Sequence, residues 1–179
     1  MTEKKLDCVI LGLLSHEDMT GYEIKQRIDR SLSYFWGASY GSIYPTLGTL
    51  VDKGYAVKKS DEGSARNKQI YSITDSGRER LKEWLSEPVK RDELRYETLL
   101  KLFFGGSAEK GQTAEHIKAF REKSKAALDD LLTAEKNLSA CLDDDDAHRY
   151  YLMTVRFGIR TYRTYIEFCD EILPALEGE

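Results

Sequence analysis

Apolar residues recur every three or four positions through the first part of the chain, which is the spacing that lines one face of an α-helix. This pattern predicts helices over residues 4–15 and 21–31, and a third helix that ends at Gly54. Thr20 is followed three residues later by Glu23, which is the capping-box pattern of a helix start. We therefore expect three successive helices before residue 55.

The start of the third helix has two candidate caps. Ser39 and Ser42 both precede its apolar positions, and serine favours the N-cap because its hydroxyl accepts a backbone N–H. If Ser42 is the cap, Pro45 lies in the first turn, where its missing N–H costs little. The helix is expected to begin at one of these two serines.

The period then changes to two. Polar and apolar residues alternate over residues 55–59 and 69–73, and the residues between these runs are polar and rich in turn formers. Two such runs around a turn predict a β-hairpin. Thr74 or Asp75 begins a fourth helix. Three helices, a hairpin and a helix predict a winged helix-turn-helix in residues 1–87.

Residues 88–179 show only helical spacing. A short helix is expected to end at Gly105-Gly106, and two long helices follow, each with apolar residues at alternating steps of three and four. In the last helix the apolar positions are Leu152, Val155, Ile159, Tyr162, Ile166, Cys169 and Leu173. A lone helical hairpin does not fully cover such a seam, so we expect it to form a homodimer. The predicted fold is α+β, mostly α, with an N-terminal winged helix-turn-helix and a C-terminal α-helical, coiled-coil-like dimerisation domain.

The composition is that of a folded protein outside the membrane. Hydrophobic residues make up 41% and there are only three prolines, which excludes a largely disordered chain. No apolar run approaches the roughly 20 residues that cross a bilayer. The N-terminus is too short in apolar residues and too acidic for a signal peptide. These features predict a cytoplasmic protein with no membrane partner.

Residues that bind metals are scattered. Cys8, Cys141 and Cys169 form no pair at zinc-ligand spacing, and the three histidines are equally far apart. Asp143 to Asp146 fit a loop and helix cap. A calcium site is the alternative for these aspartates, but the ligand spacing of an EF-hand is missing. We expect no metal and no cofactor.

The chain also lacks the motifs of common enzymes, because it contains no P-loop, GxSxG, HExxH or GxGxxG sequence. Its net charge of −4 belongs to the second half, since residues 1–86 sum to +1 and residues 87–179 to −5. A DNA-binding module needs a basic face rather than a basic total. The sequence therefore predicts a non-enzyme and leaves DNA binding open to its first half.

Four sequence blocks in the first half follow one another in a specific order and spacing. They are GYEI at 21–24, GSIYPTLGTL at 41–50, GY at 54–55, and YSITDSG at 71–77 after Arg66. In these blocks the chain resembles the PadR-like transcriptional regulators.

The likeness covers about residues 5–86. Residues 93–105 resemble, more weakly, the longer helical C-terminal domain of the virulence-activator subfamily. Where the family often has a charged residue after its YPxL block, this chain has Gly48-Thr49. The resemblance implies a homodimeric repressor of an inverted-repeat operator, released by a small-molecule or stress signal.

The third helix is the expected recognition helix, and its side away from the core is available to DNA. The candidate DNA-binding residues on it are Ser39, Tyr40, Ser42, Tyr44, Thr46 and Thr49. None is Arg or Asn, which make the clearest bidentate base contacts, so wing contacts and DNA shape are expected to contribute more. For Tyr44, packing of the helix onto the hairpin is an equal alternative.

The predicted hairpin is the expected wing. Its basic residues are Lys58, Lys59, Arg66 and Lys68. Such a tip suits phosphate contacts or insertion into the minor groove. The alternative is a solvated hairpin whose lysines prevent strand addition, and the resemblance favours DNA. Tyr22 and Lys25 on the second helix extend the candidate DNA footprint.

Two other readings stay open. Phe35, Trp36, Tyr40 and Tyr96 line an effector pocket, or they pack as ordinary aromatic residues. The whole protein could instead be an interaction adaptor that uses a winged helix to bind protein, or a sensor with little affinity for DNA. Basic residues on one face favour DNA binding over both.

Overall fold

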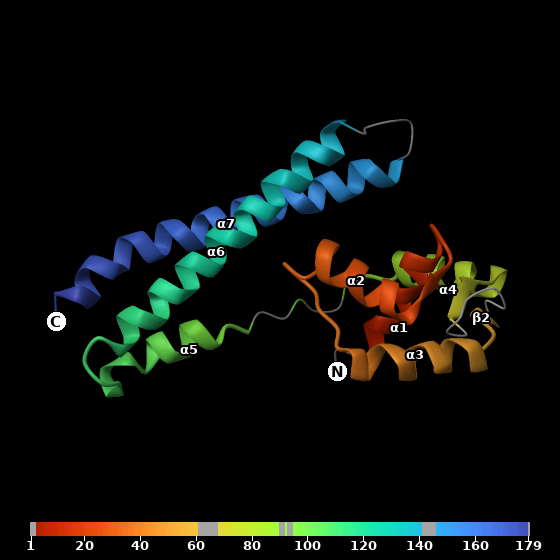
Figure 1. Ribbon diagram of the computed structural model, residues 1–179, viewed down its shortest axis with the longest axis horizontal. Coiled ribbons are helices and arrows are strands. Elements are labelled where there is room, and N and C mark those ends of the chain that lie inside the picture. The colour runs from red at the N-terminus through yellow and green to blue at the C-terminus, as the bar shows by residue number, and fades with distance from the viewer. Residues whose placement is uncertain (1–2, 61–67, 90–91, 93–94, 141–145, 179) are drawn as a thin grey trace. The chain divides into compact units, whose positions relative to one another are not determined.

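The computed structural model describes residues 3–60, 68–89, 92, 95–140 and 146–178 (Figure 1). The chain forms two compact units, Met1–Asp92 and Glu93–Glu179. The sequence-based boundary after residue 87 lies a few residues before this division.

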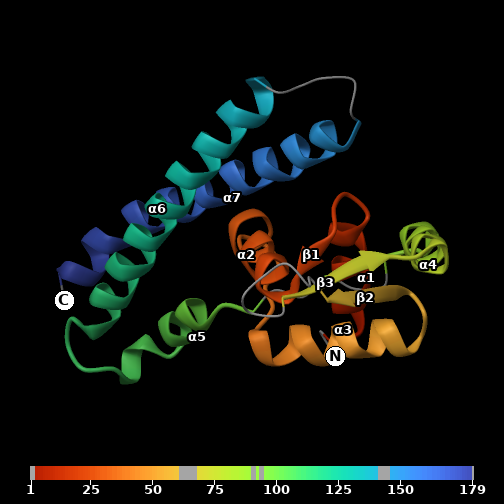
Figure 2. The same ribbon diagram turned by 45° about the vertical axis from the view of Figure 1, so that its right-hand side comes forward.

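Helices surround a small sheet in the first unit (Figure 2). Its elements are α1 (Glu3–Leu14), β1 (Met19–Thr20), α2 (Gly21–Ser31), α3 (Tyr40–Asp52), β2 (Ala56–Ser60), β3 (Gln69–Ile73) and α4 (Asp75–Ser86). The antiparallel sheet has the strand order β1-β3-β2. The predicted order of three helices, a hairpin and a helix is confirmed.

Strand β1 was not predicted, because its two residues are too few to show alternation. Met19 pairs with Tyr71 and Thr20 with Ile70, more than 40 residues away along the chain. A strand of this kind exists only because the hairpin offers it an edge. Met19 and Thr20, which lie between the first two helices, therefore form one edge of the sheet.

The predicted helix caps at Thr20 and Thr74 are present. The Glu23 amide donates to Thr20 Oγ1 at 3.2 Å and the Thr20 amide donates to Glu23 Oε2 at 2.7 Å, which completes the capping box. Thr74, rather than Asp75, caps α4, since its Oγ1 accepts the Gly77 amide at 3.0 Å.

Gly54 and Gly77 are needed where they stand. Gly54 follows the end of α3 with φ of +72°, a conformation that favours glycine. A Cβ on Gly77 would lie 2.1 Å from the carbonyl oxygen of Tyr55. Glycine thus allows α4 to start directly against the backbone that enters β2.

Helix α3 begins earlier than Ser42. Ser39 occupies the N-cap position with extended backbone angles, and its side chain makes no capping hydrogen bond. Ser42 Oγ instead donates to the Ser39 carbonyl at 2.9 Å from inside the first turn. Of the two serines that the sequence offered, Ser39 is therefore the N-cap residue, and Pro45 lies about one turn deeper in the helix than it would with Ser42 as the cap. Proline there is exposed and faces away from the core.

Aliphatic side chains from three helices fill the core of the first unit. Ile10 of α1, Ile24 and Ile28 of α2, and Ile43 and Leu47 of α3 have no exposed area. Full burial of each such side chain stabilises the fold by about 1.5–3 kcal/mol. This core fixes which side of α3 faces outwards.

The second unit is helical. It contains α5 (Glu97–Phe103), a 3₁₀ turn at Gly105–Ser107, α6 (Gln112–Ala140) and α7 (Asp146–Glu177). The two long helices lie side by side, and α5 packs on α6 (Figures 1 and 2). Residues 141–145, which include most of the aspartate run, lie outside the described residues.

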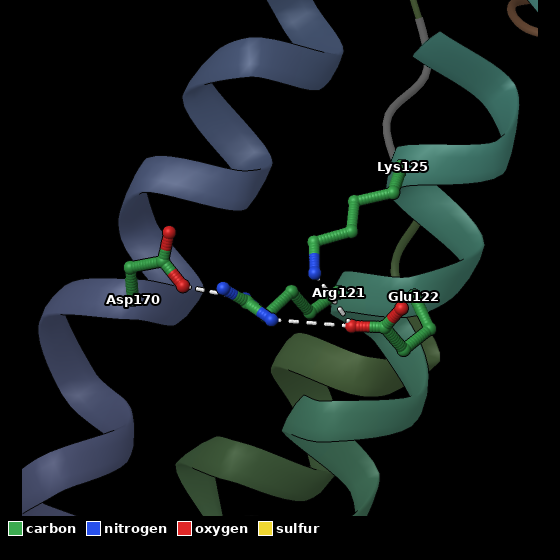
Figure 3. Close-up of polar contacts among 4 residues, drawn as sticks. All are labelled: Arg121, Glu122, Lys125 and Asp170. Carbon is green, nitrogen blue, oxygen red and sulfur yellow. Dashed lines mark hydrogen bonds and ion pairs between the residues drawn. The ribbon is translucent and has the colours of Figure 1, made fainter. Parts of the chain in front are cut away.

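Ion pairs join α6 to α7 outside their apolar seam. Arg121 contacts Asp170 across the two helices, and Glu122 beside it also accepts from Lys125 (Figure 3). Asp170 raises the pKa of the Arg121 guanidinium, and Lys125 lowers the pKa of the Glu122 carboxyl. Because these groups are partly to largely exposed, the pairs contribute little to stability.

Candidate nucleic-acid interface

Helix α3 has two distinct faces. Ile43, Leu47 and Leu50 are at most 1% exposed and pack into the core. On the other side Tyr40 and Tyr44 expose about half of their surface, at 45% and 50%. The predicted DNA-facing residues that are exposed in the structure are Ser39, Tyr40, Tyr44 and Thr49, and those half-buried are Ser42 and Thr46. The helix thus presents a polar and aromatic ridge to its surroundings.

The small hydroxyls on this ridge already donate to their own helix. Thr46 Oγ1 donates to the Ser42 carbonyl at 2.7 Å, and Thr49 Oγ1 donates to the Pro45 carbonyl at 3.0 Å. Each hydroxyl has one hydrogen, so in this arrangement it offers only lone pairs to an approaching molecule. Donation to a phosphate or a base would require the hydroxyl to rotate away from its backbone partner.

Tyr22 and Lys25 of α2 meet the start of α3. The rings of Tyr22 and Tyr40 stack at an interplanar angle of 16° with centroids 6.5 Å apart. Lys25 Nζ lies 5.3 Å from the centre of the Tyr40 ring and pairs with Asp29 one turn along α2. Gln26 Nε2 donates to the Tyr22 hydroxyl at 2.8 Å. Two helices therefore share one aromatic and charged surface.

Tyr44 both packs and remains exposed. A Cβ on Gly21 would lie 2.7 Å from Tyr44 Cε1, so the ring covers the first residue of α2. Burial raises the pKa of Tyr71 in β3, and nearby Tyr44 raises it further. The ring thus holds α3 to α2 and the sheet while half of its surface stays open. The packing alternative therefore describes part of its position, and contact of Tyr44 with DNA stays a prediction.

The described part of the hairpin presents lysines. Lys58 and Lys59 are exposed on β2, and Lys68 is exposed just before β3. Hydrogen bonds from Thr20 hold the pKa of Glu23 below its usual value, and Lys68 lowers it further. Lys68, at the base of the hairpin, is therefore near enough to the start of α2 for its charge to act on Glu23. Arg66 lies outside the described residues, and its role in the wing stays a prediction.

Comparison with known proteins identifies the family of this chain. The transcriptional regulator PadR-like family matches residues 10–83, and the virulence activator alpha C-terminal family matches residues 94–177. The probable transcriptional regulator Rv1176c of Mycobacterium tuberculosis is 30% identical over 182 residues, covering 94% of this chain and 95% of the relative. The chain belongs to the PadR-like family of transcriptional regulators.

Solved PadR-like structures agree with the architecture over nearly the whole chain. The regulator BC1756 of Bacillus cereus has a TM-score of 0.81 and 28% identity, with 97% of this chain and 99% of that chain covered. PadR of Bacillus subtilis in complex with operator DNA has a TM-score of 0.77 and 27% identity, covering 96% and 98%. The predicted fold class is confirmed, and this PadR-like regulator is a DNA-binding transcription regulator rather than an enzyme.

Sequence reasoning missed three residues of the surface shared by α2 and α3. Gly21 makes room for Tyr44, Gln26 holds the hydroxyl of Tyr22, and Asp29 pairs with Lys25. The last two were detectable, because residues four apart in a helix are neighbours. The close approach at Gly21 was not, since it depends on how two helices pack.

The four aromatic residues of the predicted pocket are engaged within their own units. Phe35 packs edge-to-face on Tyr34, and Trp36 packs against the core of the first unit. In the second unit Tyr96 packs on Phe120 and bonds to the Tyr165 hydroxyl. The pocket of Phe35, Trp36, Tyr40 and Tyr96 stays a prediction.

The residues assigned to dimerisation line the intrachain seam. Leu152, Val155 and Ile159 are 4–7% exposed because α6 covers them. The other three, Tyr162, Ile166 and Leu173, are half-buried. The argument that a partner chain must cover the seam does not hold for the first three residues. Their place in a dimer interface stays a prediction.

Metal clusters and membrane-spanning helices are absent from the described part of the chain. Among them, no group of three His, Cys, Asp or Glu side chains is placed to hold a metal ion. None of the helices in the described ranges is long and apolar enough to cross a bilayer.

Proposed function

We propose that this PadR-like regulator is a repressor that binds an inverted-repeat operator as a homodimer, with α3 in the major groove. The observation that carries the proposal is the two-faced α3, whose aliphatic side is fully buried while its tyrosines and hydroxyls remain accessible. The relative from Bacillus subtilis, named a negative transcriptional regulator and solved with operator DNA, supports it over nearly the full chain.

In this proposal, DNA is contacted by α2, by α3 and by the wing. The start of α3, with Ser39, Tyr40 and Ser42, approaches the phosphate backbone, because a helix N-terminus favours anions. Thr46, Thr49 and Tyr44 follow along the groove, and Tyr22 and Lys25 flank them. Lys58, Arg66 and Lys68 neutralise phosphates from the wing. The exposed lysines favour this function over a protein-interaction adaptor.

Homodimerisation is proposed through a second apolar stripe on α7. Tyr150, Met153 and Phe157 follow one another at steps of three and four and are 65%, 51% and 65% exposed. They lie on the side of the helix away from Leu152, Val155 and Ile159, which α6 covers. Exposed apolar groups in a row are costly in water and typical of an assembly surface. In this arrangement Leu152, Val155 and Ile159 pack within one chain and hold α7 in place, and the exposed stripe makes the contact between chains.

A small-molecule effector is the second part of the proposal. The Bacillus subtilis relative has been solved with p-coumaric acid, at a TM-score of 0.72, 26% identity and coverage of 96% and 98%. We propose that this regulator also responds to a small molecule, and that it acts on DNA in the cytoplasm.

The test is binding of the purified full chain to DNA from upstream of its own gene. Fluorescence anisotropy should show saturable binding to one fragment, with much weaker binding to a scrambled duplex of equal length and composition. Log affinity should fall linearly with log salt concentration, because phosphate contacts release counterions. Equal affinity for both duplexes, or salt-insensitive binding, would contradict the proposal.

A further inference from the structure

Two cationic side chains of α2 form ion pairs with carboxylates of the protein itself. Lys25 pairs with Asp29 and Arg27 with Glu17. The two pairs differ in exposure, since the Arg27 side chain is 47% exposed whereas that of Lys25 is only 15% exposed. Lys25 is therefore held back against the protein.

Two groups hold Lys25 in this position. Its ammonium lies over the Tyr40 ring at 5.3 Å from the centroid and contacts the Asp29 carboxylate. The Asp29 side chain is itself 52% exposed. It stands one turn beyond Lys25 on the side of α2 where Tyr22 stacks on Tyr40. A negative charge thus lies open on the surface that the proposed function turns towards DNA.

We propose that Asp29 is a specificity-determining residue that competes with DNA phosphates for Lys25 and so weakens binding to non-operator DNA. This inference rests on the proposed function. A phosphate that reaches Lys25 must displace Asp29, and the freed carboxylate then lies beside the negative backbone. At the operator, the remaining contacts fix a register in which this exchange is offset. On other sequences it is not.

The exchange is feasible because the Asp29 side chain is 52% exposed, so water and salt screen its attraction to Lys25. It also has a signature in the salt dependence. When Lys25 leaves Asp29 for a phosphate, one condensed cation is released from DNA while the bared carboxylate attracts another. The contact then adds little to the salt slope. Without the Asp29 charge, the same contact should steepen the slope by up to about 0.9.

Asp29→Asn is the variant that tests the proposal, and Glu79→Gln is its matched control. Each substitution removes one negative charge and the ion-pair partner of one lysine, since Glu79 pairs with Lys82. The control lies on α4, which packs on α1, whereas α2 packs on α3 and the sheet. A difference between the two variants therefore reports position rather than net charge. Equal thermal unfolding curves establish that both proteins fold.

The affinities of wild type and both variants are measured for the upstream fragment and the scrambled duplex between 50 and 200 mM salt, a range where phosphate contacts dominate affinity. For Asp29→Asn we expect about two- to five-fold tighter binding to the scrambled duplex, a smaller gain on the upstream fragment, and a steeper slope. Glu79→Gln should follow wild type closely.

A third protein separates competition for Lys25 from simple repulsion. In a Lys25→Met background, the added Asp29→Asn change has no lysine to release to a phosphate. It should therefore leave the salt slope unchanged and tighten binding less than it does in wild type. If the full gain and the steeper slope persist there, or if Asp29→Asn behaves like Glu79→Gln, the proposal is overturned. If wild type binds no upstream fragment, the proposed function fails, which is distinct from a wild type that binds DNA and an Asp29 variant that changes nothing.

Discussion

The two units of the chain expose different kinds of large side chains. Around α2 and α3, the exposed rings are Tyr22, Tyr40 and Tyr44, each with a hydroxyl that water or a phosphate satisfies. On α7 the exposed stripe includes Met153 and Phe157, which have no hydrogen-bonding group. The first surface therefore tolerates exposure to water, whereas the second surface is the one that the proposed dimer would cover.

The interiors of the two units also differ, in how completely they bury aliphatic side chains. The first unit closes a core over three helices and a sheet, with several aliphatic side chains at zero exposure. The second unit is built of helices alone, and among its described residues Ile117 is the one aliphatic side chain with no exposed area. Two packed helices bury only the sides that face each other, and their other sides stay in water unless another layer covers them. We therefore expect the first unit to be stable alone and the second to depend on dimerisation.

The largest effect should come from the core beneath α3, the proposed recognition helix. Leu47→Ala leaves a cavity below α3 and should lower the free energy of unfolding by about 2–5 kcal/mol. Thr49→Ala, on the exposed side two residues away, should change it by less than about 0.5 kcal/mol. Urea denaturation followed by circular dichroism measures both. Similar losses would mean that α3 does not have the two faces described.

Charge placed in the stripe of α7 should separate the chains. Phe157→Glu puts a carboxylate where the proposed interface is apolar, so light scattering at micromolar concentration should give a mass near 20.5 kDa instead of twice that value. DNA affinity should fall at least about tenfold, because one half-site no longer helps the other to bind. Phe157→Leu should remain dimeric. A dimeric Phe157→Glu protein would place the interface elsewhere.

Removal of the wing cations should weaken binding without altering sequence preference. Arg66→Ala combined with Lys68→Ala should reduce the salt slope by about one for each phosphate that the wing no longer neutralises, on operator and scrambled DNA alike. Lys82→Ala on α4 is the control. A weakening confined to operator DNA would instead assign sequence reading to the wing.

The smallest expected effect separates the two roles of Tyr44. Tyr44→Phe keeps the ring over Gly21 and removes only the hydroxyl, so the unfolding curve should stay unchanged. Operator affinity should fall by about 0.5–1.5 kcal/mol if the hydroxyl bonds to DNA. A loss of stability with unchanged DNA affinity would make Tyr44 purely a packing residue.

How far the sequence predicted the molecule depends on the range of the interactions involved. Local signals were sufficient for the capping box at Thr20 and the positive-φ residue Gly54, because neighbouring residues decide both. Strand β1 and the approach of Tyr44 to Gly21 depend on segments far apart in the chain, so no local pattern announced them.

The start of α3 and the seam of α7 show two further limits. Ser39 and Ser42 offered equal caps, and only the extended backbone at Ser39 decided between them. Leu152 and its seam neighbours have a spacing that predicts burial, but the spacing does not say whether α6 or a second chain provides the cover. Periodicity identifies the buried face of a helix and not its partner.

The central claim is that two copies of α3 read one operator. A hydroxyl-radical footprint of the purified protein on DNA upstream of its gene tests this directly. We predict two protected half-sites of inverted sequence, centred about 10 base pairs or a multiple of that spacing apart, which both weaken together in Phe157→Glu. A single protected patch without two-fold symmetry, or protection that the Phe157 variant retains in full, would contradict the account.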